Sequence, residues 1–267
     1  MKRTLLAGAL IAGVLLLTRL TTHAQSSALL TARQQALVSI SAYTTKGDLP
    51  HLHTALAQGL EAGLTVNEAK EVLVQLYAYC GFPRSLRGIT TLMQVLDERK
   101  ASGIHDVVGK AASPFTSTAP KYERGKQNLA LLTGKPKTGP KTGANAFSPE
   151  TDVFLKEHLF ADIFERDVLT FQERELATIA ALVSLGGVEP MLQFHLGAGL
   201  HVGLTEAQLR QLIGLSEVVV GQPQAEAARA LLAKTLDANR KEPLAPGTCA
   251  ILLNEPPAVL GYSFIIP

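Results

Sequence analysis

The stretch Glu61-Ala62-Gly63-Leu64-Thr65 recurs as His201-Val202-Gly203-Leu204-Thr205, 140 residues further along the chain. Two more pairs match at offsets of 139 and 140: Leu30-Thr31 with Leu169-Thr170, and Gly81-Phe82-Pro83 with Gly221-Gln222-Pro223. One single-residue insertion accounts for the change of offset. Internal similarity at a fixed spacing indicates two copies of one structural unit. The sequence therefore predicts a tandem repeat.

Both copies carry the same helix-start signal, a Thr followed three residues later by Gln or Glu, which is typical of an N-terminal capping box. It occurs at Thr31–Gln34, Thr65–Glu68, Thr170–Glu173 and Thr205–Gln208. The residues that follow have apolar positions at helical spacing, and no convincing run alternates as a strand would. We therefore predict an all-α protein with pseudo-two-fold symmetry, its repeats covering residues 28–100 and 149–240.

Composition narrows the class of protein. The chain has 267 residues, 46% of them hydrophobic, which excludes a disordered chain because this much apolar surface can offset the entropy of ordering. Two cysteines cannot form a disulfide framework. The formal charge of +2 gives no electrostatic footprint for nucleic acid.

The N-terminus is typical of a secretory signal peptide. Lys2 and Arg3 precede the apolar run 5–17, and Thr22-His23-Ala24 offers a small-residue cleavage site. An uncleaved N-terminal anchor is the alternative, although 13 apolar residues are short for a membrane span. Cleavage after Ala24 leaves 22 basic and 23 acidic residues. We expect a signal peptide at 1–24, a periplasmic or secreted protein, and no stable membrane association after cleavage.

The segment 101–148 between the repeats differs in character and is predicted to be a linker. Seven basic residues and one acid lie between Lys110 and Lys141, and Pro-Lys-Thr-Gly occurs twice. This pattern favours a solvated loop, with an anion-binding or partner-docking arm as the alternative. Ser148-Pro149 is expected to cap the following helix. The apolar, Pro-rich tail 241–267 is expected to wrap the surface in an extended form or to pack on a neighbouring subunit.

The motif Glu71-x-x-x-Gln75-x-x-x-Tyr79-x-Gly81-x-Pro83, preceded by Gly63-Leu64-Thr65, resembles the carboxymuconolactone decarboxylase family. In the second half, Arg174-Glu175-Leu176 and His195, eight residues before Gly203, look like the same family, which includes the alkylhydroperoxidase D-like enzymes. The resemblance implies an all-α fold that assembles into homo-oligomers with pockets near subunit interfaces. For this chain it implies a trimer of two-repeat chains, or a dimer.

The chain departs from the peroxidase branch of that family, which carries a Cys-x-x-Cys between the glutamate and the histidine. Here the stretch is Gly187-Val188-Glu189-Pro190, and the other copy has Gly47, Asp48 and Pro50. A thiol peroxidase needs one cysteine to attack and another to resolve, so this activity is disfavoured. A non-catalytic binding or assembly scaffold is the other alternative.

The decarboxylase branch needs no thiol and no cofactor, because its conjugated lactone substrate accepts the electrons left by departing CO2. The protein must orient the carboxylate, stabilise a dienolate and deliver a proton to carbon, which suits a His with a carboxylate and a hydroxyl donor. We therefore expect a cofactor-free lyase, or a related acid–base enzyme, acting on a small lactone or carboxylate. Export counts against the cytoplasmic role in aromatic degradation, so the substrate itself stays open.

His195 and Glu175 match the family's histidine and relay glutamate; the alternatives are a core histidine and a first-turn glutamate that serves the helix dipole. Glu71, Gln75 and Tyr79 step by four and share one helical face over about 12 Å, which suggests a lined cavity rather than a solvated stripe. We predict as catalytic residues His195, Glu175, Glu71 and Tyr79. We predict as substrate-binding residues Gln75, Cys80, Phe82 and Pro83.

The two halves keep complementary parts of this set. The first lacks the histidine and has Ala55 in its place. The second has Gln211, Leu215 and Val219 at the positions that match the polar row Glu71, Gln75 and Tyr79. We therefore predict one composite pocket per chain where the halves meet.

Two further features are weaker signals. His51 and His53 are two residues apart, a spacing that supports a metal pair only weakly, so we expect surface histidines and no metal site. Cys80 and Cys249 could pair in an oxidising compartment, or Cys80 could be a small buried residue.

Overall fold

The computed structural model describes residues 29–136 and 138–241, and over these ranges the chain contains helices and no strands. The prediction of an all-α fold is therefore confirmed. The expected signal peptide, the C-terminal tail and Cys249 lie outside the described residues. Within them, no helix is long and apolar enough to cross a bilayer.

The helices of the two repeats follow one another in the same order. The first repeat consists of α2 (Ala32–Lys46), α3 (Leu49–Glu61) and α4 (Val66–Ala101). The second consists of α8 (Phe171–Leu185), α9 (Glu189–His201), α10 (Glu206–Val220) and α11 (Gln222–Lys241). The long helix α4 corresponds to α10 and α11 together, so the two repeats have one helix plan.

All four predicted capping boxes are present. In each, the Thr side chain accepts a hydrogen bond from the backbone N–H three residues on, and the Gln or Glu side chain accepts from the Thr backbone N–H. These pairs satisfy donors that a helix N-terminus otherwise leaves unpaired. The helix starts at Thr31, Thr65, Thr170 and Thr205 are thus determined locally.

A glycine bends both repeats at the same point. Gly81 has φ 80° and ψ 162° inside α4, and Gly221 has φ 81° and ψ 166° between α10 and α11. Only glycine adopts such positive φ values without steric cost. In each repeat the outer helix then starts with a proline at its second position, Pro83 or Pro223, where no backbone donor is lost.

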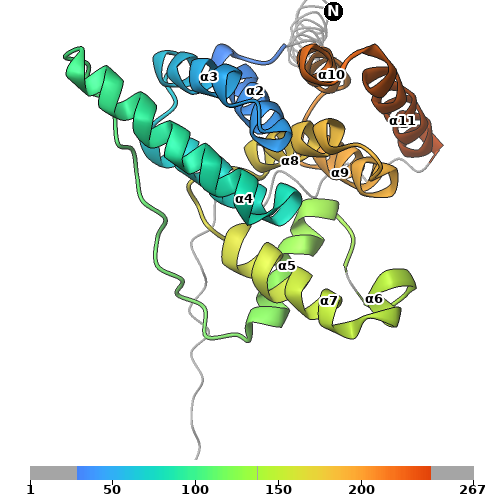
Figure 1. The fold of residues 1–267 in the computed structure, drawn as a ribbon. Coiled ribbons are helices and arrows are strands. Elements are labelled where there is room, and N and C mark those ends of the chain that lie inside the picture. The colour runs from blue at the N-terminus through green and yellow to red at the C-terminus, as the bar shows by residue number, and fades with distance from the viewer. Residues whose placement is uncertain (1–28, 137, 242–267) are drawn as a thin grey trace, which may run out of the picture.

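The core forms where the repeats meet. Helix α2 packs along α8 at the centre of the molecule (Figure 1), and α4 and α10 each contact both of them. Fully buried side chains at this centre include Leu37 and Ile40 of α2, and Leu176 and Ile179 of α8. Burying one such aliphatic side chain contributes about 1.5–3 kcal/mol. Each repeat therefore supplies a large part of the apolar surface that stabilises the other.

The expectation of a solvated loop over Lys110–Lys141 is wrong in its middle part. Lys121–Thr133 forms α5, which packs against the π-helix η1 (Phe154–Ile163), and two short helices, α6 (Gly143–Phe147) and α7 (Pro149–Val153), lie between them. Figure 1 shows this unit on one side of the bundle. Leu132 is fully buried beside Leu159 and Phe160, so apolar burial overrides the basic composition.

The acidic residues that neutralise this segment come from a later part of the chain. Lys121 pairs with Asp162 of η1 at 2.9 Å, and Arg124 pairs with Glu165 at 2.9 Å. Composition within the segment itself gave no sign of these partners.

A helix does begin at Pro149, but the side chain of Ser148 makes no N-cap hydrogen bond. The expectation of a Ser148 cap is therefore wrong.

Candidate active site

A buried histidine–glutamate pair joins α8 to α9. The Nδ1 atom of His195 lies 2.9 Å from Oε2 and 3.1 Å from Oε1 of Glu175. Glu175 is fully buried and His195 is 6% exposed. A carboxylate on Nδ1 holds the proton at that nitrogen and leaves Nε2 to exchange one. Among the described residues Nε2 has no hydrogen-bond partner.

This geometry identifies the partners of His195 and Glu175. The partner of His195 is a carboxylate rather than a backbone carbonyl. The helix-start position of α8 is occupied by Glu173, which completes the capping box with Thr170, so Glu175 points to the interior and does not serve the N-terminus. Both side chains therefore lie in the interior, paired with each other.

Tyr79 reaches this pair from the first repeat. Its ring meets the His195 ring edge-on, with centroids 5.8 Å apart and an interplanar angle of 79°. Burial, together with the nearby charge of Glu175, raises the pKa of Tyr79 well above its usual value. The hydroxyl is buried without a hydrogen-bond partner of good geometry among the described residues, although the nearby Thr178 hydroxyl acts to lower its pKa. Tyr79 thus remains a protonated, uncommitted donor.

Glu71 and Gln75 are tied to Arg174 of the second repeat. Arg174 is fully buried and donates to Glu71 Oε1 and to Gln75 Oε1, at 2.8 Å each. Arg166 also donates to Glu71, with Nε 2.8 Å from Oε1. Burial acts to raise the pKa of Glu71, but hydrogen bonds from Arg166 and Arg174 hold that pKa below its usual value. The polar row therefore faces protein groups, where a lined cavity was predicted.

The remaining predicted substrate-binding residues make other contacts. Phe82 is 63% exposed and stacks on Tyr77, with centroids 4.5 Å apart, while Pro83 is exposed. Cys80 is half-buried and donates from Sγ to the Leu76 carbonyl oxygen, and burial raises its pKa. Among the described residues, none of these three has a hydrogen bond or ring contact with His195. The structure thus brings together Tyr79, Glu175 and His195 but not this second group.

The sequence motif included Arg174 but assigned it no role, and it did not include Arg166 or Thr178. Arg174 stands next to Glu175 in the chain, and a charged residue followed by the apolar run of α8 was an available signal for a buried ion pair. The Nε atom of Arg174 is buried without a partner among the described residues, and its guanidinium lies 5.7 Å from the Phe164 ring centroid. The polar network around the site is thus larger than the motif.

Tyr79 of the first repeat contacts His195 of the second, but the cavity beside Val183 and the groove beside Arg87 do not include His195, Glu175 or Tyr79. His51 pairs with Asp48 and His53 with Glu98, at 2.8 Å each, so these histidines have different carboxylate partners. Over the described ranges, no group of three or more His, Cys, Asp or Glu residues could hold a metal ion.

Comparison with known proteins agrees with the two-repeat helix plan. The model of the carboxymuconolactone decarboxylase family matches residues 16–91 and 149–234, one match in each half. The chain is also 32% identical, over 84 residues, to the 4-carboxymuconolactone decarboxylase of Acinetobacter baylyi (strain ATCC 33305 / BD413 / ADP1). That match spans 32% of this chain and 62% of the relative, less than two thirds of its length. The chain belongs to the carboxymuconolactone decarboxylase family, as a member with two repeats in tandem.

Proposed function

We propose that the protein is an exported, cofactor-free carboxy-lyase, or a closely related acid–base enzyme, that acts on a small lactone or carboxylate. The observation that carries this proposal is the buried Glu175–His195 pair with the Tyr79 ring against it. The named activity of the Acinetobacter relative supports the same class of reaction. Together, His195, Glu175 and Tyr79 supply a proton donor, a fixed carboxylate and a hydroxyl in one place.

The proposed reaction breaks the bond between the carboxylate carbon and the ring of an unsaturated lactone. CO2 leaves, and the bonding electron pair delocalises into the conjugated lactone as a dienolate. Protonated His195 then gives its Nε2 proton to the dienolate carbon and regains a proton from water. Glu175 stabilises the imidazolium, and the Tyr79 hydroxyl donates to the dienolate oxygen.

Substitution of His195 tests the reaction directly. With 4-carboxymuconolactone as substrate and CO2 release as readout, we expect His195→Gln to lower kcat by at least about 100-fold, since general acid catalysis contributes 10²–10⁴-fold. His105→Gln is the matched control because His105 is exposed and remote from the pair in the chain. Tyr79→Phe should lower kcat by about 100-fold, the effect of losing one oxyanion donor, with little change in KM.

The result that would reject the enzyme is equally concrete. If the unsubstituted protein turns over none of a panel of small lactones and keto acids, or if His195→Gln retains full activity, the dyad is not catalytic. A non-catalytic binding or assembly scaffold would then be favoured.

Export and self-association are part of the same proposal. The leader-like sequence at residues 1–24 supports export. Phe82, Leu86 and Met93 form one apolar stripe on α4 and are 63%, 57% and 60% exposed, which supports burial against a second chain. Mass spectrometry of the secreted protein and light scattering test both points. An N-terminus at Met1, or the mass of a single chain, would contradict them.

A further inference from the structure

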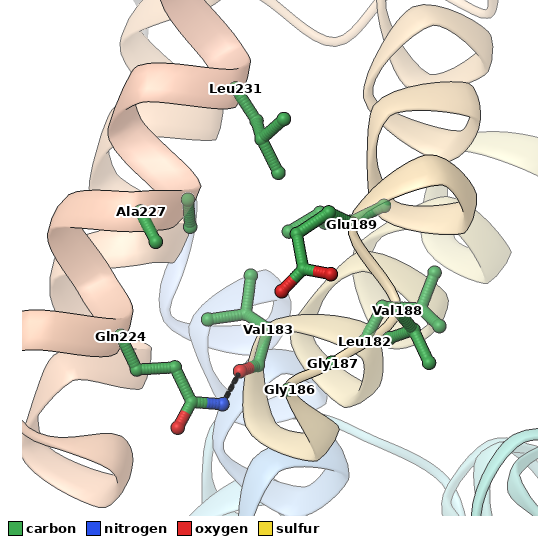
Figure 2. Close-up of a pocket in the computed structure, with 11 residues that line it drawn as sticks. Leu182, Val183, Gly186, Gly187, Val188, Glu189, Gln224, Ala227 and Leu231 are labelled. Atoms are coloured by element: carbon green, nitrogen blue, oxygen red, sulfur yellow. Dashed lines mark hydrogen bonds between the residues drawn. The ribbon is translucent and has the colours of Figure 1, made fainter.

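Each repeat has a cavity or groove at the same location, between its second helix and the outer helix that follows the bend at Gly81 or Gly221. In the second repeat, a cavity of about 30 Å³ lies between the start of α9 and the inner face of α11 (Figure 2). In the first repeat, a groove of about 420 Å³ lies between the start of α3 and the outer half of α4. The groove is lined by Leu49, Pro50, His53, Arg87, Thr90, Thr91 and Gln94. The space at this location is small in the second repeat and large in the first.

Three lining positions correspond between the two spaces and are occupied by different residues. At an offset of 140, Ala227 and Leu231 of the cavity in the second repeat correspond to Arg87 and Thr91 of the groove in the first. Glu189, whose carboxylate points into the space between α9 and α11 in Figure 2, corresponds to Leu49. At this location the first repeat therefore has an apolar side chain where the second has an acid, and an arginine where the second has an alanine.

Arg87 is an exposed cation without a partner among the described residues, because no hydrogen bond or ion pair involves its guanidinium. The Gln94 side-chain amide is likewise uncommitted within the described chain. His53 already has a partner in Glu98, with Nε2 2.8 Å from Oε2. The hydroxyl protons of Thr90 and Thr91 are donated to backbone carbonyls of their own helix. The donors left for a ligand are Arg87 and Gln94.

We propose that this groove is a second binding site, specific for a small monocarboxylate with an apolar body. A guanidinium holds a carboxylate through two parallel hydrogen bonds, and Gln94 adds a further donor. Leu49 and Pro50 at the start of α3 provide an apolar wall for the body of the ligand. The volume of about 420 Å³ is that of an ordinary small-molecule pocket. This site is separate from His195 and belongs to the first repeat.

The test compares benzoate with benzamide, which has the same shape but no charge. All titrations use the full chain carrying His195→Gln, so that binding at the proposed active site is weakened. By calorimetry, we expect benzoate to bind at least 10-fold more tightly than benzamide. Adding Arg87→Gln should weaken benzoate binding at least 10-fold. Adding Arg210→Gln, the same charge change on an exposed arginine of α10, should leave it unchanged.

A second variant introduces the residues of the second repeat into the groove of the first. Arg87→Ala with Thr91→Leu places the residues of the second repeat in the groove and should abolish saturable benzoate binding while the thermal transition remains cooperative. Should this variant fail to fold, Arg87→Gln decides, because Arg87 is exposed. Equal benzoate affinity in Arg87→Gln and its parent, equal affinity for benzamide and benzoate, or no benzoate binding by the parent would each overturn the proposal.

Discussion

At the scale of single residues, the polar groups between the repeats divide into two sets with different roles. Tyr79, Glu175 and His195 leave a hydroxyl and an imidazole nitrogen uncommitted, which acid–base chemistry requires. Glu71 and Arg174 instead form an ion pair in the interior. A buried ion pair contributes little net stability compared with an apolar pair, but removing one partner leaves an isolated buried charge.

Glu71→Ala should therefore destabilise the fold strongly. Arg174 would keep a buried charge with no carboxylate, and we expect the free energy of unfolding to fall by about 3–5 kcal/mol, measured by urea denaturation. Glu206→Ala removes the exposed partner of Arg210 and is expected to cost about 0–1 kcal/mol. A loss below about 1 kcal/mol for Glu71→Ala would show that Arg174 finds solvent or another partner.

At the scale of helices, the unit formed by α5 and η1 depends on a close approach of two backbones. A Cβ atom added at Gly125 of α5 would lie 1.7 Å from the carbonyl oxygen of Lys156 in η1. The glycine is therefore required by packing, although α5 would be more stable in isolation with an alanine there. Tyr122 and Lys141 bond to Asp152 in the same unit, at 2.7 and 2.9 Å.

Gly125→Ala should separate α5 from η1 and lower the free energy of unfolding by about 1–3 kcal/mol, the cost of overpacking. Gly214→Ala is the matched control, since Gly214 is also within a helix but has nothing within 4 Å of an added Cβ. It should raise stability by about 0.5–1 kcal/mol through helix propensity. Thermal denaturation of both variants checks this, and the same sign of change in both would contradict the packing argument.

At the scale of the whole molecule, carboxylates with lowered pKa values hold the segment between the repeats in place. Burial acts to raise the pKa of Asp152, but hydrogen bonds from Lys156 and Tyr122 bring it down to about 2. Lys110 and Ser113 lower the pKa of Asp167. Because such groups have higher pKa values when unfolded, their stabilisation is complete above about pH 4 and is lost as pH falls toward about 2.

We therefore expect acid to release the inter-repeat unit before the repeat core. Hydrogen-exchange protection factors, corrected for the intrinsic rate at each pH, should be lower at pH 3 than at pH 7 in α5 and η1, while α2 and α8, whose contact is largely apolar, should stay protected. Asp152→Asn should be less stable at pH 7 and lose less stability on acidification. Equal loss of protection in α2 and α5 at pH 3 would count against this order.

The sequence by itself determined the features that depend on neighbours in the chain. The helix starts at Thr31, Thr65, Thr170 and Thr205 followed from a Thr and an acceptor three residues apart, and the bends at Gly81 and Gly221 from glycines that tolerate positive φ. The repeat offset then gave the two-fold helix plan.

Only the tertiary structure decided which side chains meet. Glu71 and Gln75 share a helical face in the sequence, but whether that face meets solvent, a cavity or Arg174 depends on the packing of the other repeat. The basic composition around Lys121–Thr133 predicted a loop rather than a helix. The acidic partners of this helix lie more than 25 residues away, at Asp162 and Glu165, so the local composition did not show them. Long-range pairs such as Tyr79 with His195 arise from packing, which local patterns do not specify.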